Sequence, residues 1–279
     1  MKKSIFTLLV ILFAATSVFA QSKREKEVKN LFAQIEKTDS DAKKTELANR
    51  IQHEMAQILV EENDFFYDFP SLPNVGKIMS SDQQIHMYTW NVLLSDGTSQ
   101  YYALFHHNEY HALYSLSRGM PIIPTTNKYF SEKDWYGALY YDIHPIKYND
   151  KEMYMVFGLI ISADGETQHK VIDVLSFSKK AIKMGAPSFI TPWTGKRKQH
   201  RVLFQYDKEA QLSLEYNPKK KTIVFDHLAP IRKTKDGKDI MAPDMSYDAL
   251  VYKKDIWTYQ KDINAKNKKD KKDKKDKKK

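Results

Sequence analysis

The sequence predicts an α+β protein that is predominantly antiparallel β-sheet, as a sandwich or a curved meander, with an N-terminal helical pair. Apolar residues recur at helical spacing only within residues 21–63. About eleven short runs rich in Tyr, Val, Ile and Phe follow in the β-rich part, residues 64–265. Most of the turns between these runs are too short for a parallel crossover, so neighbouring strands are expected to be antiparallel.

The helical pair is expected from two apolar stripes with Lys, Glu and Gln opposite them. The segment Thr38-Asp39-Ser40-Asp41 separates the stripes and offers side-chain oxygens that can cap the second helix. Both helices are expected to pack on the sheet or against each other. The stripes consist of Val28, Leu31, Phe32 and Ile35, then Leu47, Ile51, Met55, Ile58 and Leu59.

Residues 135–177 predict three successive strands, and the rest of the β-rich part is organised around them. The middle run, Met153 to Ile161, is apolar on both faces, so it is expected at the centre of a sheet. Asn149 and Asp150 predict the turn before it, and Asp164-Gly165 predicts the hairpin after it. The other strands are expected over residues 85–94, 101–106, 111–116, 202–206, 211–216, 222–227, 247–252 and 256–259.

Residues 1–20 predict a secretory signal peptide. Lys2 and Lys3 precede an apolar run from Ile5 to Ala15, which is too short to cross a hydrocarbon core of about 30 Å. The chain contains no Cys, so neither a cysteine-linked lipid nor a disulfide is expected. We therefore expect an exported monomer, periplasmic or extracellular, that is not a lipoprotein and has no transmembrane segment after cleavage.

The net charge of +10 comes mainly from the two ends of the chain. Residues 266–279 contain ten Lys and three Asp, and Lys2 and Lys3 belong to the signal peptide. Residues 21–265 therefore carry a net charge of only +1. The low-complexity tail has no apolar residue to offset the entropy of ordering, so it is expected to be disordered. Export argues against nucleic acid as a dedicated partner.

Several short sequence motifs between about Phe65 and Ala265 can be recognised. They include Tyr88-Thr89-Trp90-Asn91, the run from Lys170 to Leu175, and the run from Val224 to Leu228. In these motifs the chain resembles an uncharacterised family of exported β-rich proteins from Bacteroidota-type bacteria. The resemblance implies export and one β-rich unit, and it implies no activity because the family has none assigned.

A histidine-rich segment, residues 106–111, is the densest group of metal-ligand types. In an extended strand, His107, Glu109 and His111 would share one face and could hold Zn²⁺ or a similar ion. Their order is not that of a helical His-Glu-x-x-His metalloprotease. The alternative is an exposed polar turn that contains histidines, and no cofactor is assigned to the chain.

Carboxylates and imidazoles on or beside strands define a candidate acid–base set. Brought together, they could act as general acid and base in an exported hydrolase. The alternative is that they face solvent or form hydrogen bonds at strand ends. Motifs for a nucleophile elbow, a P-loop or a dinucleotide site are absent from the sequence. The six candidates are Asp142, His144, Asp226, His227, Asp244 and Asp248.

A loop near residue 193 predicts a binding surface. Trp193 lies between Pro and Thr, so it is the Trp best placed to be exposed and to stack on a sugar ring, although most Trp and Tyr are expected in the core. The basic residues that follow could bind an anionic cell-envelope component. A non-catalytic binding or envelope-associated protein is therefore favoured over an enzyme. The basic residues are Lys196, Arg197, Lys198 and Arg201.

Overall fold

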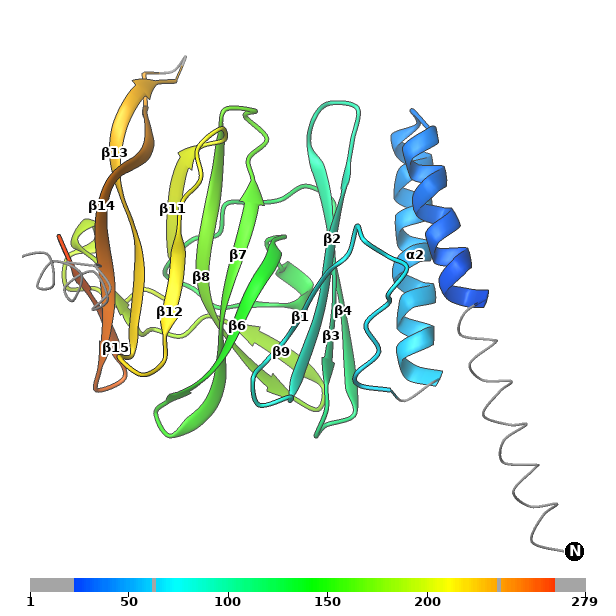
Figure 1. Ribbon diagram of the computed structural model, residues 1–279, viewed down its shortest axis with the longest axis horizontal. Coiled ribbons are helices and arrows are strands. Elements are labelled where there is room, and N and C mark those ends of the chain that lie inside the picture. The colour runs from blue at the N-terminus through cyan, green and yellow to red at the C-terminus, as the bar shows by residue number, and fades with distance from the viewer. Residues whose placement is uncertain (1–22, 62–63, 235–236, 264–279) are drawn as a thin grey trace, which may run out of the picture.

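The computed structural model describes residues 23–61, 64–234 and 237–263 (Figure 1). The predicted signal peptide, residues 1–20, and the predicted tail, residues 266–279, lie outside the described residues. Two helices and three sheets are stacked in one direction, largely in the order of the sequence (Figure 1). The predicted fold class, antiparallel sheet with an N-terminal helical pair, is confirmed. None of the described helices is long and apolar enough to cross a bilayer.

The first layer consists of a helix over residues 23–37 and helix α2, Asp41–Glu61. Ser40 Oγ accepts a hydrogen bond from the Lys43 backbone N–H at 3.3 Å, which caps α2 as predicted. Both apolar stripes are buried against the first sheet, where Trp90 and Tyr102 stack with ring centroids 5.6 Å apart. The helices therefore cover one face of this sheet.

Sheet A contains β1 (Gly76–Met79), β2 (Ile85–Leu93), β3 (Ser99–His107) and β4 (Ala112–Arg118), in that order and all antiparallel. Successive side chains of a strand point to opposite faces, so β2 and β3 serve two cores. Tyr88 and Leu104 pack under the helices, whereas Met87 and Phe105 pack against sheet B. Sheet A is therefore covered on both faces.

Sheet B is built on the three predicted central strands, β6 (Leu139–Tyr148), β7 (Lys151–Ile161) and β8 (Thr167–Ser178). As predicted, β7 is central and apolar on both faces: Val156 packs toward sheet A, and Phe157 packs toward sheet C. The far edge of β8 is divided between two strands. Its first half pairs with β11 (Val202–Asp207) and its last residues pair with β9 (Ala181–Met184), which in turn pairs with β5 (Phe130–Ser131).

Sheet C has the order β10, β15, β14, β13, β12. The β10–β15 pair is parallel, and the other pairs are antiparallel. Leu250 and Trp257 pack with Phe157 and Phe204 in the core between sheets B and C. The strand bounds are β10 (Phe189–Ile190), β12 (Leu214–Asn217), β13 (Thr222–Lys233), β14 (Asp239–Lys253) and β15 (Ile256–Gln260).

Four strands, β1, β5, β9 and β10, were not predicted from the sequence. Each contains only two or four residues. A run of that length shows too little alternation to be recognised as a strand. All four lie at the ends of their sheets or are held by pairing with longer strands, so long-range contacts and not local pattern define them.

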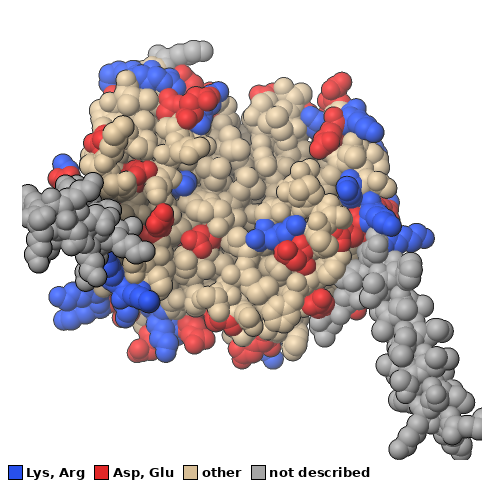
Figure 2. All heavy atoms as spheres, viewed as in Figure 1, with Lys and Arg blue, Asp and Glu red and all other residues tan. Residues whose placement is uncertain are grey.

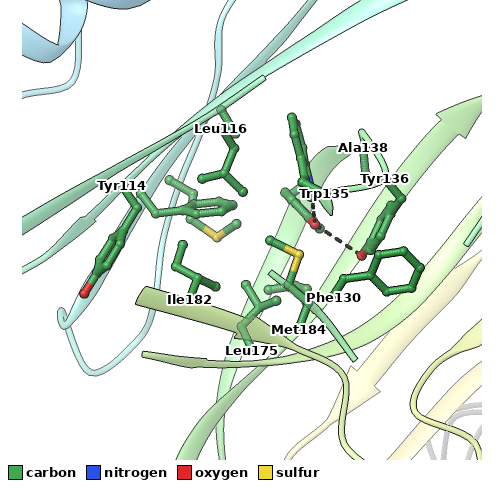
Figure 3. Close-up of a cluster of buried hydrophobic side chains, with 14 of the residues drawn as sticks. Tyr114, Leu116, Phe130, Trp135, Tyr136, Ala138, Leu175, Ile182 and Met184 are labelled. Atoms are coloured by element: carbon green, nitrogen blue, oxygen red, sulfur yellow. Dashed lines mark hydrogen bonds between the residues drawn. The ribbon is translucent and has the colours of Figure 1, made fainter. Parts of the chain in front are cut away.

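The core between sheets A and B contains a chain of hydrogen bonds among aromatic side chains (Figure 3). Trp135 Nε1–H donates to Tyr140 Oη at 3.1 Å, and the Tyr140 hydroxyl donates to Tyr136 Oη at 3.2 Å. The Tyr136 hydroxyl then donates to Asp173 Oδ2 at 2.9 Å. Each buried polar group in this chain is thereby satisfied inside an otherwise apolar layer.

Candidate functional site

A pocket of about 520 Å³ opens where β11 of sheet B meets β13, β14 and β15 of sheet C. This volume lies within the range of sites for small ligands. Polar groups reach it from Gln205 of β11, from Asp226 and His227 of β13, and from Lys261 beyond β15. Most of the wall is apolar and comes from Trp193, Leu203, Phe204, Phe225, Leu228 and Met241.

One histidine in this pocket is held in a fixed orientation. The pairing of β13 with β14 shifts register at His227, and a bulge of this kind redirects side chains. His227 Nδ1–H donates to Asp248 Oδ2 at 2.6 Å. The same oxygen accepts the Tyr259 hydroxyl at 2.6 Å, and Oδ1 accepts the Asp262 backbone N–H at 3.0 Å.

The surroundings of Asp248 suit a functional role for this histidine. Asp248 is 2% exposed, and no Lys or Arg among the described residues forms an ion pair with it. A buried carboxylate is costly unless donors surround it, and here an imidazole, a phenol and an amide supply them. Because Nδ1 is bound to Asp248, Nε2 is the ring nitrogen that remains for a ligand or water in the pocket.

Three of the six predicted acid–base residues converge here: Asp226, His227 and Asp248 all line the pocket. Asp226 Oδ2 accepts the Ser213 backbone N–H at 2.6 Å, and both residues also line a neighbouring pocket of about 560 Å³, so Asp226 lies between the two pockets. Residues that are 22 positions or fewer apart in the sequence thus meet because β13 and β14 are paired.

The other three predicted acid–base residues lie elsewhere. His144 Nε2 and Asp142 Oδ2 form a separate pair on β6 at 2.8 Å, with the imidazole against the rings of Phe157 and Tyr216. Asp244 is exposed on β14, and hydrogen bonds from Ser246 lower the pKa of its carboxyl. None of the three lines the pocket described above.

The predicted aromatic feature of the 191–198 loop lies at one edge of the pocket. Trp193 is 54% exposed and belongs to a one-turn helix, Pro192–Thr194. Its indole packs edge-on against the ring of Tyr259, with centroids 5.7 Å apart. Residues 196–198, the exposed basic run, follow in the same loop. An aromatic surface is thus available at the pocket edge, whereas residues 196–198 do not line the pocket.

Arg201 does not belong to this exposed basic surface, which corrects the prediction from sequence. Its side chain is fully buried, and Nε–H donates to Asp173 Oδ2 at 2.8 Å. Nη1–H groups donate to the backbone carbonyls of Thr125 and Lys128 at 2.6 and 2.9 Å. Complete burial raises the pKa of Asp173, and the Arg201 guanidinium opposes that shift. Arg201 therefore tethers a loop to sheet B and is not available to an external anion.

The predicted metal ligands His107, Glu109 and His111 do not form a site. β3 ends at His107 and β4 begins at Ala112, so the residues between them form a turn and not an extended strand. His107 is buried and stacks on Tyr110 at 3.9 Å, whereas His111 is exposed. Within residues 23–61, 64–234 and 237–263, no three His, Asp or Glu side chains are grouped as metal ligands.

Two features of the structure were not anticipated from the sequence. The first is a smaller pocket of about 320 Å³, which is lined by Ser162 and His169. Ser162 Oγ and His169 Nδ1 are 3.0 Å apart, and burial lowers the pKa of His169 to about 4.

The second feature is a group of lysines on two hairpin tips at one end of sheet C. The two tips lie side by side because the Tyr252 N–H donates to the Lys221 carbonyl at 3.0 Å. Figure 2 shows this end, at the lower left, rich in basic side chains. The exposed lysines are Lys219, Lys220, Lys221, Lys253 and Lys254.

Comparisons with protein-family models, with curated proteins and with solved structures find no match to this chain. The side chains of the pocket between β11 and sheet C are therefore the basis for assigning a function. They combine an exposed aromatic ring, an apolar wall and a small set of oriented polar groups, which is the usual composition of a site for a small organic ligand.

Proposed function

We propose that this chain is an exported binding protein, and that its ligand is a glycan of the cell envelope held in the pocket between β11 and sheet C. The observation that supports this proposal best is the exposed indole of Trp193 at the pocket mouth. The apolar face of a sugar ring stacks on such an indole. Asp226 and His227 can then bind sugar hydroxyls deeper in the pocket. The signal-peptide pattern of residues 1–20 supports export.

Glycan binding is tested with a glycan array, followed by calorimetry on the glycans that bind. Trp193→Ala should weaken the affinity about tenfold, because about 1.4 kcal/mol of stacking would be lost. Phe66→Ala is the matched control: Phe66 is 55% exposed, but it packs against Phe65 and does not line the pocket. Equal affinity of the Trp193→Ala variant, or an array without any bound glycan, would contradict the proposal.

A second partner, an anionic component of the envelope, is favoured by the five lysines on the hairpin tips. Exchanging Lys219, Lys221 and Lys254 for Glu should abolish binding to vesicles that contain phosphatidylglycerol. The same exchange at Lys23, Lys26 and Lys29, exposed on the first helix, should leave binding unchanged. Wild-type binding that survives 0.5 M salt, where the Debye length is about 4 Å, would argue against an electrostatic surface.

A further inference from the structure

We propose that the pocket also hydrolyses its ligand, with His227 as the general base that activates a water molecule. This inference rests on the proposed function, because it takes the pocket of Trp193 as the substrate site. The substrate class is an acyl ester of a sugar hydroxyl: the sugar ring lies on Trp193, and the acyl group faces the apolar wall. The protein would then remove acyl groups from the glycan that it binds.

The hydrogen bonds of the His227–Asp248 pair orient the imidazole for this role. Nδ1–H is donated to Asp248, so Nε2 is the ring nitrogen left to accept a proton from water in the pocket that His227 lines. Tyr259 and the Asp262 N–H hold the carboxylate from the other sides, so Asp248 acts as a positioning residue. An imidazole oriented by a buried carboxylate is the arrangement that general-base catalysis uses.

The remaining walls suit an ester with an apolar acyl group. Phe204, Leu228 and Met241 form an apolar surface against which the acyl group can pack. Lys261 brings a positive charge to the same pocket, where it can stabilise the negative charge that develops on the carbonyl oxygen. The base comes from β13, the apolar wall from β11, β13 and β14, and the cation from the residue after β15, and all of them line this one pocket.

The reaction balances without a cofactor. Nε2 of His227 takes a proton from water as the water oxygen bonds to the ester carbonyl carbon, which gives a tetrahedral intermediate. The bond from that carbon to the sugar oxygen then breaks, and the sugar oxygen takes the proton back from Nε2. One ester and one water become one carboxylic acid and one sugar hydroxyl, and His227 returns to its initial state.

The Asp142–His144 pair provides an internal control for this inference. Its atoms lie at a similar distance, 2.8 Å, but the pair is on β6 and its imidazole packs against aromatic rings. It does not line the pocket of Trp193. If any surface histidine with a carboxylate partner sufficed for hydrolysis, His144 would serve as well as His227.

The test measures hydrolysis of p-nitrophenyl butyrate and of per-O-acetylated glucose by the purified protein. His227→Gln should lower kcat/KM at least about 100-fold, the usual contribution of a general base. Asp248→Asn should lower kcat with little change in KM, because it disturbs the orientation of the imidazole and not the apolar wall. His144→Gln should keep wild-type activity, and circular dichroism confirms that each variant is folded.

The outcomes separate catalysis from binding. Hydrolysis that is equal in wild type and His227→Gln, or absent for both esters, overturns the catalytic role of His227. The glycan affinities of wild type and Trp193→Ala test the binding proposal by themselves, because Trp193 lines the pocket but lies outside the His227–Asp248 pair. If the esters are hydrolysed through His227 while the array shows no glycan, the activity stands and a different alcohol carries the acyl group.

Discussion

Replacing Arg201 with Met should lower the free energy of unfolding by about 3–5 kcal/mol, because the Asp173 carboxylate would stay buried without its counter-ion. Both side chains are completely shielded from solvent, so water cannot take the place of the guanidinium. Three backbone carbonyls, those of Thr125, Lys128 and Met184, would also lose their donor. Each lost hydrogen bond contributes about 1 kcal/mol, which places the expected loss at the upper end of the range.

Urea unfolding followed by circular dichroism measures this loss. Arg50→Met is the matched control, since Arg50 pairs with Glu27 at the surface, where the two side chains are 54% and 45% exposed. A surface pair contributes at most about 1 kcal/mol, so this variant should remain close to wild type. The comparison isolates burial, because both substitutions remove the same charge.

A double variant tests the reasoning more sharply. Asp173→Asn together with Arg201→Met removes both charges, so no uncompensated ion stays in the core. The double variant should therefore be more stable than Arg201→Met alone, although it has lost more hydrogen bonds. A single variant that costs less than 1 kcal/mol, or a double variant that costs the sum of its parts, would refute the electrostatic account.

Three further predictions concern single positions. Burial lowers the pKa of His169 from 6.5 to about 4 in the folded protein. As the pH falls, the unfolded chain therefore takes up a proton at this histidine before the folded chain does. Up to about 3 kcal/mol of the free energy of unfolding is lost between pH 6.5 and 4. His169→Gln should remove this dependence of the urea midpoint, whereas the exposed His53→Gln should not. Gly158→Ala would place a Cβ atom 3.1 Å from two core side chains, so it should lower the free energy of unfolding by about 1–3 kcal/mol. Gly119→Ala is the control: its Cβ would meet no atom within 4 Å, so the urea midpoint should not change. Asp150→Gly should raise Tm by stabilising the β6–β7 turn by about 0.5–1 kcal/mol, because φ is 59° there, and a lower Tm would contradict this.

The elements that could be predicted are those whose signals are local. The continuous apolar run of residues 153–161 and the turns on either side of it were enough to place β6, β7 and β8, and the polar segment Thr38–Asp41 was enough to place the start of α2. The stacking of three sheets was not predictable, because it depends on which strand edges meet. The division of the β8 edge between β9 and β11, for example, leaves no trace in the sequence of β8.

The candidate site was predictable in its residue types but not in its assembly. His227 and Asp248 could be singled out as an imidazole and a carboxylate beside strands, but their contact depends on the β13–β14 register and on the bulge. Arg201 was misassigned because the neighbouring Lys and Arg residues are exposed, whereas its own partner, Asp173, lies 28 positions earlier. Local composition does not reveal such a distant partner.

The three sheets are stacked in the order in which their strands occur in the sequence, with one exception that determines when the pocket is complete during folding. A chain that emerges from its N-terminus can bury the helices on sheet A before sheet C exists. Strand β11 breaks this order: it completes sheet B, although it follows β10 of sheet C in the sequence. The pocket is formed by β11 together with β13, β14 and β15. It is therefore complete only after nearly all the described residues have folded. A partly folded chain therefore lacks the pocket, and the proposed site exists only in the complete stack of three sheets.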